Sequence, residues 1–250
     1  KKGAKGWETY SGWFGFWFAP WDDLVQWLGV EQTLYDLIMR PKFIHKLMER
    51  LIDAWLFRLD QYERLNLLAL NNGPNRVGSG GYGFSNELPQ ADFDGNQVRP
   101  IDLWGSCAAQ IFAAVSPQMH EEFALQHELR WLERFGLTYY GCCEPLHKKI
   151  PILKKIPNLR KISISPWADL NQAVQNIGNQ YVLSLKPSPA IFAVDDWDLD
   201  EARRQLVSSL EKTKGCSVEV IMRDISTCRN EPQRLWDWAK MAQEVTEEYA

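Results

Sequence analysis

The residues best suited to chemistry in this chain lie in Leu137–His147, which reads Leu-Thr-Tyr-Tyr-Gly-Cys-Cys-Glu-Pro-Leu-His. Its first four residues are apolar, β-branched or aromatic, which predicts a strand that ends at Gly141. Two thiols, a carboxylate and an imidazole follow. Zinc binds cysteine, histidine and carboxylate side chains, and a catalytic zinc keeps one position open. The candidate metal ligands here are Cys142, Cys143, Glu144 and His147, and Glu144 is also a candidate catalytic residue.

The same residues also have an ordinary structural interpretation. Successive side chains of a strand point to opposite faces, so one of the two cysteines would be a small buried hydrophobic residue. Glu144 precedes Pro145, and a helix that begins at a proline would be favoured by a carboxylate at its N-terminus. His147 would then lie in solvent. The spacing of these residues matches no zinc-finger pattern, and both interpretations stay open at this stage.

The overall composition excludes several classes of protein. The chain has 250 residues, of which 45% are hydrophobic and 24% charged, as in ordinary globular domains. Its net charge of −4 offers no basic surface for nucleic acid. The longest aromatic run is too short to cross a membrane, and no signal peptide is apparent. Five cysteines do not resemble a disulfide framework, so we expect a cytoplasmic protein with free thiols.

Residues 1–30 form an aromatic N-terminal segment that holds much of the chain's excess of tryptophan. The favoured interpretation is a hydrophobic core or a homodimer interface, because aromatic side chains dominate the energetics of both. The alternative is a wall for a flat ligand. Two helices follow, over residues 31–39 and 41–64, and Pro41 suits the first position of the second. His45 lies beside the polar face of that helix and is expected to be solvated.

The rest of the chain alternates between expected strands and helices. The expected strands are 66–71, 137–142, 159–165, 181–186 and 217–225, with a further candidate within 102–115. The expected helices are 116–135, 146–155, 169–177, 198–212 and 230–249, with N-caps at Ser116, Asp198 and Asn230. This order predicts an α/β fold with a parallel sheet. The strands read as nearly continuous apolar runs, which is typical of buried parallel strands.

Polar or reactive residues follow each expected strand, at the edge where α/β folds build their active sites. Lys186 and Asp224 are candidate catalytic residues there. The candidate substrate-binding residues are Asn71, Asn72, Tyr140, Ser165 and Trp167. The glycine-rich stretch 77–83 contains no phosphate-binding motif and is expected to be a flexible loop.

Three stretches resemble the uroporphyrinogen decarboxylase superfamily, and in particular its decarboxylase-like branch from anaerobic bacteria. They are Ser116–Phe123, Phe135–Leu146 and Ile156–Trp167. The resemblance covers about residues 30–250 and implies that 1–250 is a single TIM-type (β/α)8 barrel domain with its site at the carboxyl ends of the strands. Only five or six strands are apparent, so we expect either that the N-terminal units are missing from this chain or that residues 1–65 hide further strands.

The superfamily includes cobalamin-dependent methyltransferases, which carry a His-x-Cys motif after a central strand and a second cysteine near the C-terminus. The histidine position falls here on Tyr140 and the cysteines fall on Cys142 and Cys228. The resemblance therefore implies a zinc-dependent methyltransferase that acts with a corrinoid protein as partner. A small-molecule methyl donor or thiol acceptor would complete the reaction.

Two alternatives to methyl transfer remain. One is decarboxylation of a porphyrinogen in tetrapyrrole biosynthesis, which the same superfamily performs and which needs cationic side chains for many carboxylates. Arg130, Arg160, Lys186 and Arg223 are the available cations. The other alternative is a barrel that binds a partner without catalysis. The reactive residues after the strand at 137–142 favour an enzyme, and we favour methyl transfer.

Overall fold

The structure, a computed structural model, describes residues 17–250 and is built around one five-stranded parallel sheet. The strands lie side by side in chain order. They are β3 (Trp104–Cys107), β4 (Leu137–Tyr140), β5 (Leu159–Ile164), β6 (Val182–Leu185) and β7 (Ser217–Val220). All four pairings are parallel, as the alternation of strands and helices predicts. The α/β class is therefore confirmed, with five parallel strands in the described part of the chain where a closed barrel has eight.

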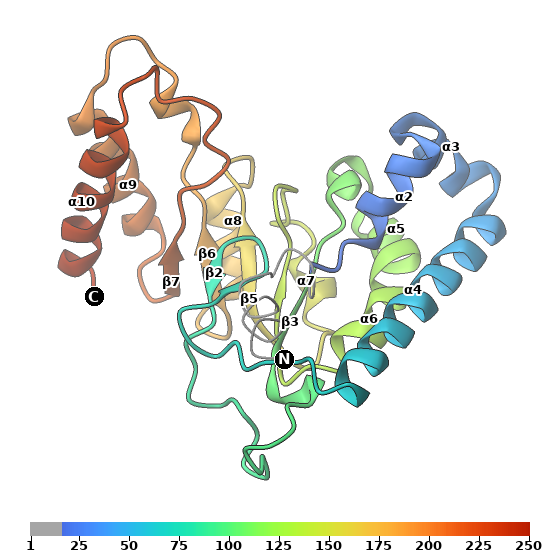
Figure 1. Cartoon of the computed structure of the whole chain (residues 1–250). Coiled ribbons are helices and arrows are strands. Elements are labelled where there is room, and N and C mark those ends of the chain that lie inside the picture. Colours follow the sequence, from blue (N-terminus) through green and yellow to red (C-terminus); the bar gives the residue numbers. More distant parts are fainter. Residues whose placement is uncertain (1–16) are drawn as a thin grey trace.

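Helices connect the strands and extend the molecule at both ends of the sheet (Figure 1). They are α2 (Pro20–Leu28), α3 (Val30–Met39), α4 (Pro41–Arg64), α5 (Pro117–His120), α6 (Gln126–Leu132), α7 (Ile150–Leu153), α8 (Leu170–Ile177), α9 (Leu199–Lys212) and α10 (Gln233–Glu248). A π-helical turn, η3 (Glu121–Leu125), joins α5 to α6, and short 3₁₀ turns are η1 (Pro100–Asp102), η2 (Gln110–Ala114) and η4 (Pro189–Phe192). The helices α2–α4 lie at one end of the sheet, and α9 and α10 lie at the other.

Most of the predicted helix starts are confirmed. The side chain of Ser116 accepts a hydrogen bond from the Met119 amide, and that of Asp198 accepts one from the Glu201 amide. Such caps satisfy amides that the first helical turn leaves unpaired. The predicted cap at Asn230 is wrong. The last helix begins after Pro232, and Asn230 instead takes a left-handed backbone conformation with φ of 62°.

The strand predicted at 66–71 is not formed. The chain turns after α4, where the Leu67 amide donates to the Tyr62 carbonyl, and then runs beside β3 without a strand pairing. The Asn71 side chain pairs with β3 instead. Its amide donates to the Trp104 carbonyl over 3.0 Å and its carbonyl accepts from the Trp104 amide over 2.9 Å. A single side chain thus satisfies backbone groups at the edge of β3 that another strand would otherwise bind.

The sheet has two chemically different faces. The helix face carries apolar side chains such as Ile162, Ile164 and Leu183, which pack in the main hydrophobic core. The opposite face, here called the hairpin face, is covered by the antiparallel hairpin of β1 (Arg76–Val77) and β2 (Gly81–Tyr82). Most side chains on this face are polar, and they are Tyr139, Lys161, Ser163, Ser184, Lys186 and Glu219. The prediction of nearly continuous apolar strands is therefore wrong, because the side chains alternate between these faces.

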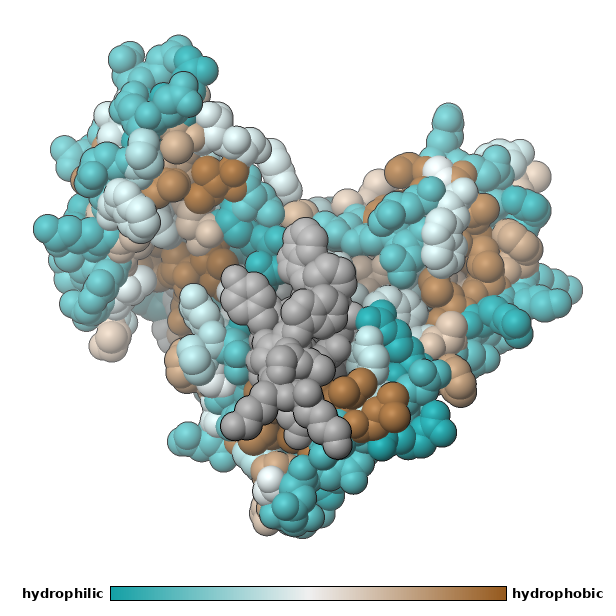
Figure 2. Space-filling model, in the orientation of Figure 1, coloured by the Kyte–Doolittle hydropathy of each residue, from teal (hydrophilic) through white to brown (hydrophobic). Residues whose placement is uncertain are grey.

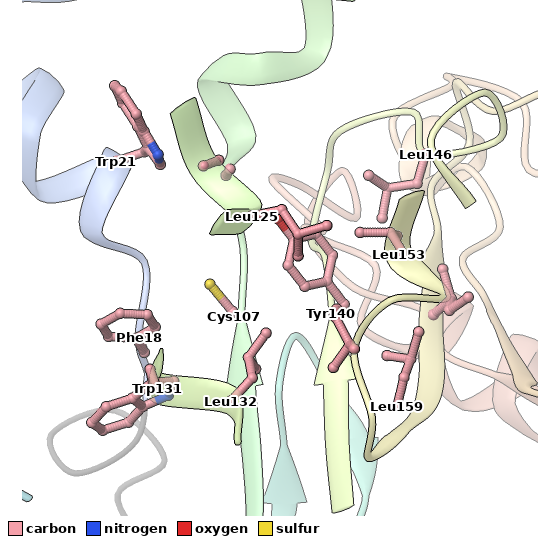
Figure 3. Packing of buried hydrophobic residues seen from close by; sticks show 14 of the residues in the cluster. Phe18, Trp21, Cys107, Leu125, Trp131, Leu132, Tyr140, Leu146, Leu153 and Leu159 are labelled. Carbon is pink, nitrogen blue, oxygen red and sulfur yellow. The ribbon is translucent and has the colours of Figure 1, made fainter. Parts of the chain in front are cut away.

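Aromatic residues near the N-terminus belong to the core. Phe18 stacks on Trp131 with ring centroids 4.5 Å apart, and Trp21 meets the Phe112 ring edge-on at the same distance. Figure 3 shows Phe18 and Trp21 beside the helices that cover β3. The core interpretation is confirmed for these residues, whereas Trp27 is 64% exposed. Trp7, Trp13, Phe14 and Phe16 lie outside the described residues.

The surface at the α2–α4 end of the molecule is partly apolar. Figure 2 shows hydrophobic residues on this part of the surface. The large exposed apolar side chains here are Trp27, Val30, Tyr35, Ile38, Met39 and Phe43. The expected homodimer stays a prediction. None of the helices within residues 17–250 has the length and apolar character needed to cross a bilayer.

Candidate functional site

The chain makes a sharp bend directly after β4, and the bend depends on glycine. Gly141 has a φ of 99°, a conformation that other residues rarely adopt. A Cβ atom there would lie 2.4 Å from the Leu146 side chain. The Gly141 amide still donates to the Cys107 carbonyl, so the bend begins where the pairing of β3 and β4 ends. The two cysteines therefore emerge at the carboxyl edge of the sheet, as predicted.

The adjacent thiols lie together but differ in exposure. Cys142 is 3% exposed, whereas Cys143 is exposed. Their sulfur atoms are 3.5 Å apart, and the Cys143 sulfur also lies 3.5 Å from a carboxylate oxygen of Asp224. Asp224 comes from the loop after β7 and has a φ of 60°. The structure thus brings together three of the predicted site residues from two strand ends, and one cysteine is buried, as side-chain alternation predicts.

Lys186 supplies a buried positive charge at the same edge. It follows β6 and is 4% exposed. Its ammonium group donates to the Cys142 carbonyl over 2.9 Å, to the Ser163 hydroxyl over 2.7 Å and to the Ser79 hydroxyl. Three acceptors match the three protons of an ammonium group. Lys186 therefore contacts the backbone of the segment that carries the thiols, and each of its three N–H groups has an acceptor.

The surroundings give the two thiols opposite acidities. The pKa of Cys142 is lowered, first by the hydrogen bond from Cys143 and then by the charges of Lys186 and Arg223, against the opposing effect of burial. The pKa of Cys143 is raised, first by the same hydrogen bond and then by burial. Burial lowers the pKa of Lys186, and the nearby Cys142 opposes this shift. Of the two thiols, Cys142 is therefore the one that loses its proton first, and the thiolate is the nucleophilic form.

Glu144 ties two strand-end loops together. It is 1% exposed. One carboxylate oxygen accepts from the Cys142 amide over 2.9 Å and the other from the Ala109 amide over 3.3 Å. No helix begins at Pro145, so the helix-dipole interpretation of Glu144 is wrong. Both carboxylate oxygens serve the backbone and hold the Cys142 segment in place.

Tyr140 lies on the helix face of the sheet and points away from the thiols. Figure 3 shows its ring reaching into the core toward Leu125. Its hydroxyl donates to the Glu128 carboxylate over 2.7 Å and lies 2.7 Å from a ring nitrogen of His120. Burial raises the pKa of Glu128 to about 7 and lowers that of His120 to about 3. The sequence analysis missed this buried polar network. The position of Glu128 among the apolar residues of its helix could have indicated it.

The remaining substrate-binding candidates have different surroundings. The Asn72 side chain donates to the Leu88 carbonyl over 2.6 Å, and that of Asn71 pairs with β3 as described above. Ser165 is 3% exposed at the end of β5, and its hydroxyl has no partner among the described residues. Trp167 is 77% exposed. Ser165 is thus the one of these four with an unused polar group at the carboxyl edge.

The predicted zinc ligands do not assemble as one set. The His147 ring is half-buried beside Asp169 and Lys148, and its backbone carbonyl accepts from Asn176. Cys228 is half-buried in the loop before α10. Nowhere in residues 17–250 do three histidine, cysteine or acidic side chains gather closely enough to hold a metal ion. These predicted ligands therefore do not form a complete zinc site, and zinc binding at the thiols stays a prediction.

The glycine-rich stretch contributes to the site in a way that the sequence analysis missed. It forms the hairpin that covers the polar face of the sheet, and Ser79 at its turn lies between Lys186 and the Tyr139 hydroxyl. Arg223 donates to the Ser79 carbonyl. The stretch is therefore a packed cover for the site, where a flexible loop was expected. Polar residues alternate with apolar ones in β5 and β6, and this alternation could have indicated that another segment covers the polar face.

Comparison with known proteins gives no assignment. No family model matches the chain, and no curated protein does. The resemblance to the uroporphyrinogen decarboxylase superfamily therefore remains an expectation that rests on the three stretches quoted above.

Proposed function

We propose that this chain is a group-transfer enzyme of the methyltransferase kind, with Cys142 at its reaction centre. The observation that carries the proposal is the thiol pair at the end of β4, where Cys142 is the more acidic member. A thiolate held at the carboxyl edge of a parallel sheet is in the position where such folds perform chemistry. A buried structural cysteine would have no need of Lys186 and Arg223 beside it.

We further propose that the five-stranded sheet is the wall of a TIM-type (β/α)8 barrel. Its strands are all parallel and follow chain order, as in such barrels. Side chains also meet over strands that are not neighbours. The Tyr139 hydroxyl on β4 donates to Ser184 on β6, and Lys161 on β5 binds Glu219 on β7. These pairs span two strand spacings, about 10 Å, so they favour a sheet that curves around its hairpin face.

In this proposal a corrinoid on a separate protein supplies the methyl group. The chain's own residues prepare the accepting edge. Lys186 and Arg223 favour negative charge on sulfur there, and Cys143 keeps its proton and donates it to the Cys142 sulfur. Glu144 holds the Cys142 amide and so limits movement of the thiolate. No step is assigned to zinc, because the ligands predicted around the thiols do not form a complete set.

The test is methyl transfer from methylcobalamin to a panel of small thiols, with cobalamin absorbance and thioether formation as the two readouts. We expect the wild-type chain to transfer the methyl group. In this proposal the Cys142 thiolate takes the proton of the acceptor thiol, whose sulfur forms the new C–S bond as the bond from the methyl group to the corrinoid breaks and the corrinoid keeps the electron pair. The Cys142→Ser variant should therefore lose at least ~100-fold in rate. Cys216→Ser is the matched control and should retain the wild-type rate, since Cys216 lies next to β7 at the opposite edge of the strands.

Decarboxylation of a porphyrinogen is the second candidate, and one observation favours it. The positive charges of Arg76, Arg223 and Lys186 all act on Cys142, so the edge is cationic enough to attract a carboxylate. The other expected cations lie elsewhere, since Arg130 binds Asp53 and Arg160 binds Glu87. Release of carbon dioxide from uroporphyrinogen, without methyl transfer, would establish this alternative. Activity in neither assay would favour a barrel that only binds a partner.

A further inference from the structure

Two histidines from different helices meet at the surface of the helix layer and line one cavity. His45 lies on α4 and His127 on α6, and their facing nitrogens, Nδ1 and Nε2, are 3.0 Å apart. The His45 ring also stacks on Phe123 with centroids 4.8 Å apart. The prediction that His45 is solvated is therefore wrong, because α4 packs against this second helix.

Gln126 completes a triangle with the two imidazoles. Its side-chain amide lies 3.3 Å from His45 Nδ1 and 3.4 Å from His127 Nε2. A half-turn of that amide places its carbonyl oxygen there instead of its nitrogen. Three ligand atoms around a tetrahedral zinc ion, with bonds of about 2.0–2.1 Å, are separated by roughly 3.3 Å. The triangle thus already has the dimensions of one face of a metal coordination shell.

Carboxylates surround this triangle. It opens into a cavity of about 590 Å³ that Glu49, Asp53 and Arg130 also line. Asp53 is paired with Arg130 over 2.7 Å. Glu49 is four residues after His45 on α4, so both side chains point to the same side of the helix, and its charge acts on His127. Glu49 therefore adds negative charge to the cavity into which the triangle opens.

Two features outside the triangle also match a metal site. The other ring nitrogen of His45, Nε2, lies 3.7 Å from a carboxylate oxygen of Glu122. Metal-binding histidines usually direct their second nitrogen at such a carboxylate, which orients the ring. The π-helical turn η3 ends directly before Gln126. Such turns are rare and occur frequently at functional sites, because the extra residue changes where the following side chains point.

We propose that His45, Gln126 and His127 form a binding site for a divalent transition-metal ion such as zinc, with water in the remaining coordination positions. Imidazole nitrogen with amide oxygen and water is a ligand set for zinc, nickel or cobalt. The site joins α4 to the helix that leads into β4, so the bound ion holds these two helices together. It is independent of the thiols and of the proposed methyl transfer.

The test is titration of the purified full chain with Co²⁺ and Zn²⁺, with the visible absorption of Co²⁺ as the probe. A Cys142→Ser/Cys143→Ser variant removes any binding at the thiols. We expect this variant to bind one ion with the spectrum of nitrogen and oxygen ligands and without a thiolate charge-transfer band. In that background, His45→Gln and His127→Gln should each weaken binding by at least ~100-fold, and Glu122→Gln by about tenfold. Glu133→Gln, at an exposed position directly after α6, is the control and should leave affinity unchanged.

Thermal unfolding supplies a second readout that does not depend on activity. Zinc should raise the Tm of the double-cysteine variant, and this rise should disappear in its His45→Gln derivative. The His45 side chain is 27% exposed, so the His45→Gln variant is expected to fold. It therefore tests the proposal even if the His127→Gln variant does not fold. Absence of ion binding in the double-cysteine variant would overturn the proposal, as would unchanged affinity after substitution of both histidines.

Discussion

The two adjacent cysteines after β4 share one chemistry but take different roles. Cys143 has a single S–H, and both the Cys142 sulfur and the Asp224 carboxylate lie 3.5 Å from its sulfur. A proton on Cys143 stabilises a negative Cys142, and the positive charges of Lys186 and Arg223 act in the same direction. Glu144, whose carboxylate accepts hydrogen bonds from the Cys142 and Ala109 amides, opposes them. The net effect lowers the pKa of Cys142, so the buried cysteine is the more acidic member of the pair.

Cys142 should react with iodoacetamide at lower pH than an ordinary thiol. Only the thiolate reacts, so a lowered pKa moves the midpoint of the pH–rate curve to lower pH. Replacing Cys143 with alanine removes the largest cause of the shift and should move the midpoint upward. Site-resolved mass spectrometry measures both, with Cys216, whose pKa burial raises, as the internal reference. A Cys142 midpoint at or above that of Cys216 would contradict the assignment.

Among the secondary-structure elements, the β1–β2 hairpin has the strictest packing requirement. It lies on the polar face of the sheet, where the Lys161 ammonium donates to the Tyr82 carbonyl over 2.6 Å. Glycines let its backbone approach so closely. A Cβ atom on Gly83 would lie 1.9 Å from the Asn71 carbonyl oxygen, and that oxygen belongs to the backbone. Since neither partner is a flexible side chain, one of the two segments would have to move.

Gly83→Ala should therefore destabilise the fold, by about 1–3 kcal/mol from overpacking. Gly73→Ala is the matched control, because a Cβ atom there meets nothing within 4 Å. That substitution should be neutral or slightly stabilising, through lower entropy of the unfolded chain. Urea unfolding of the two variants beside the wild type measures the difference. Equal stability of the two variants would show that the hairpin does not pack as described.

Across the whole molecule, Lys161 links strands that do not pair with each other. From β5 its ammonium binds the Glu219 carboxylate of β7 over 2.7 Å. It also lies 5.3 Å from the centre of the Trp104 ring on β3. The two edge strands of the sheet thus meet one side chain of the central strand.

Lys161→Met should lower the free energy of unfolding by about 3 kcal/mol. This value is the lower end of the range for breaking a buried ion pair, and it applies because 22% of the Glu219 side chain is exposed. The cost arises because Glu219 is left charged without its partner. The double variant Lys161→Met/Glu219→Gln removes that charge and should recover part of the loss. Chemical denaturation of Lys161→Met, of Glu219→Gln and of the double variant measures the coupling free energy between the two side chains. Additive losses would mean that the pair does not couple β5 to β7.

Local patterns in the sequence predicted most of the elements and the place of the thiols. Strand–helix alternation predicts a parallel sheet because each strand needs a crossover to return to the same end. Capping residues such as Ser116 and Asp198 predict helix starts because their hydrogen bonds span only a few residues. Cys142 and Cys143 follow β4 directly, so their position at the sheet edge also depends on local structure.

The groups that surround those thiols depended on tertiary packing. Ser79, Lys186 and Asp224 reach the end of β4 from three other segments, and His45 meets His127 across 82 residues of chain. The local periodicity of the sequence does not predict such contacts, because they depend on which faces of the sheet and helices pack together. The polar face of the sheet shows the same limit. Its serines and Lys161 read as part of apolar strands until the hairpin that covers them is in place.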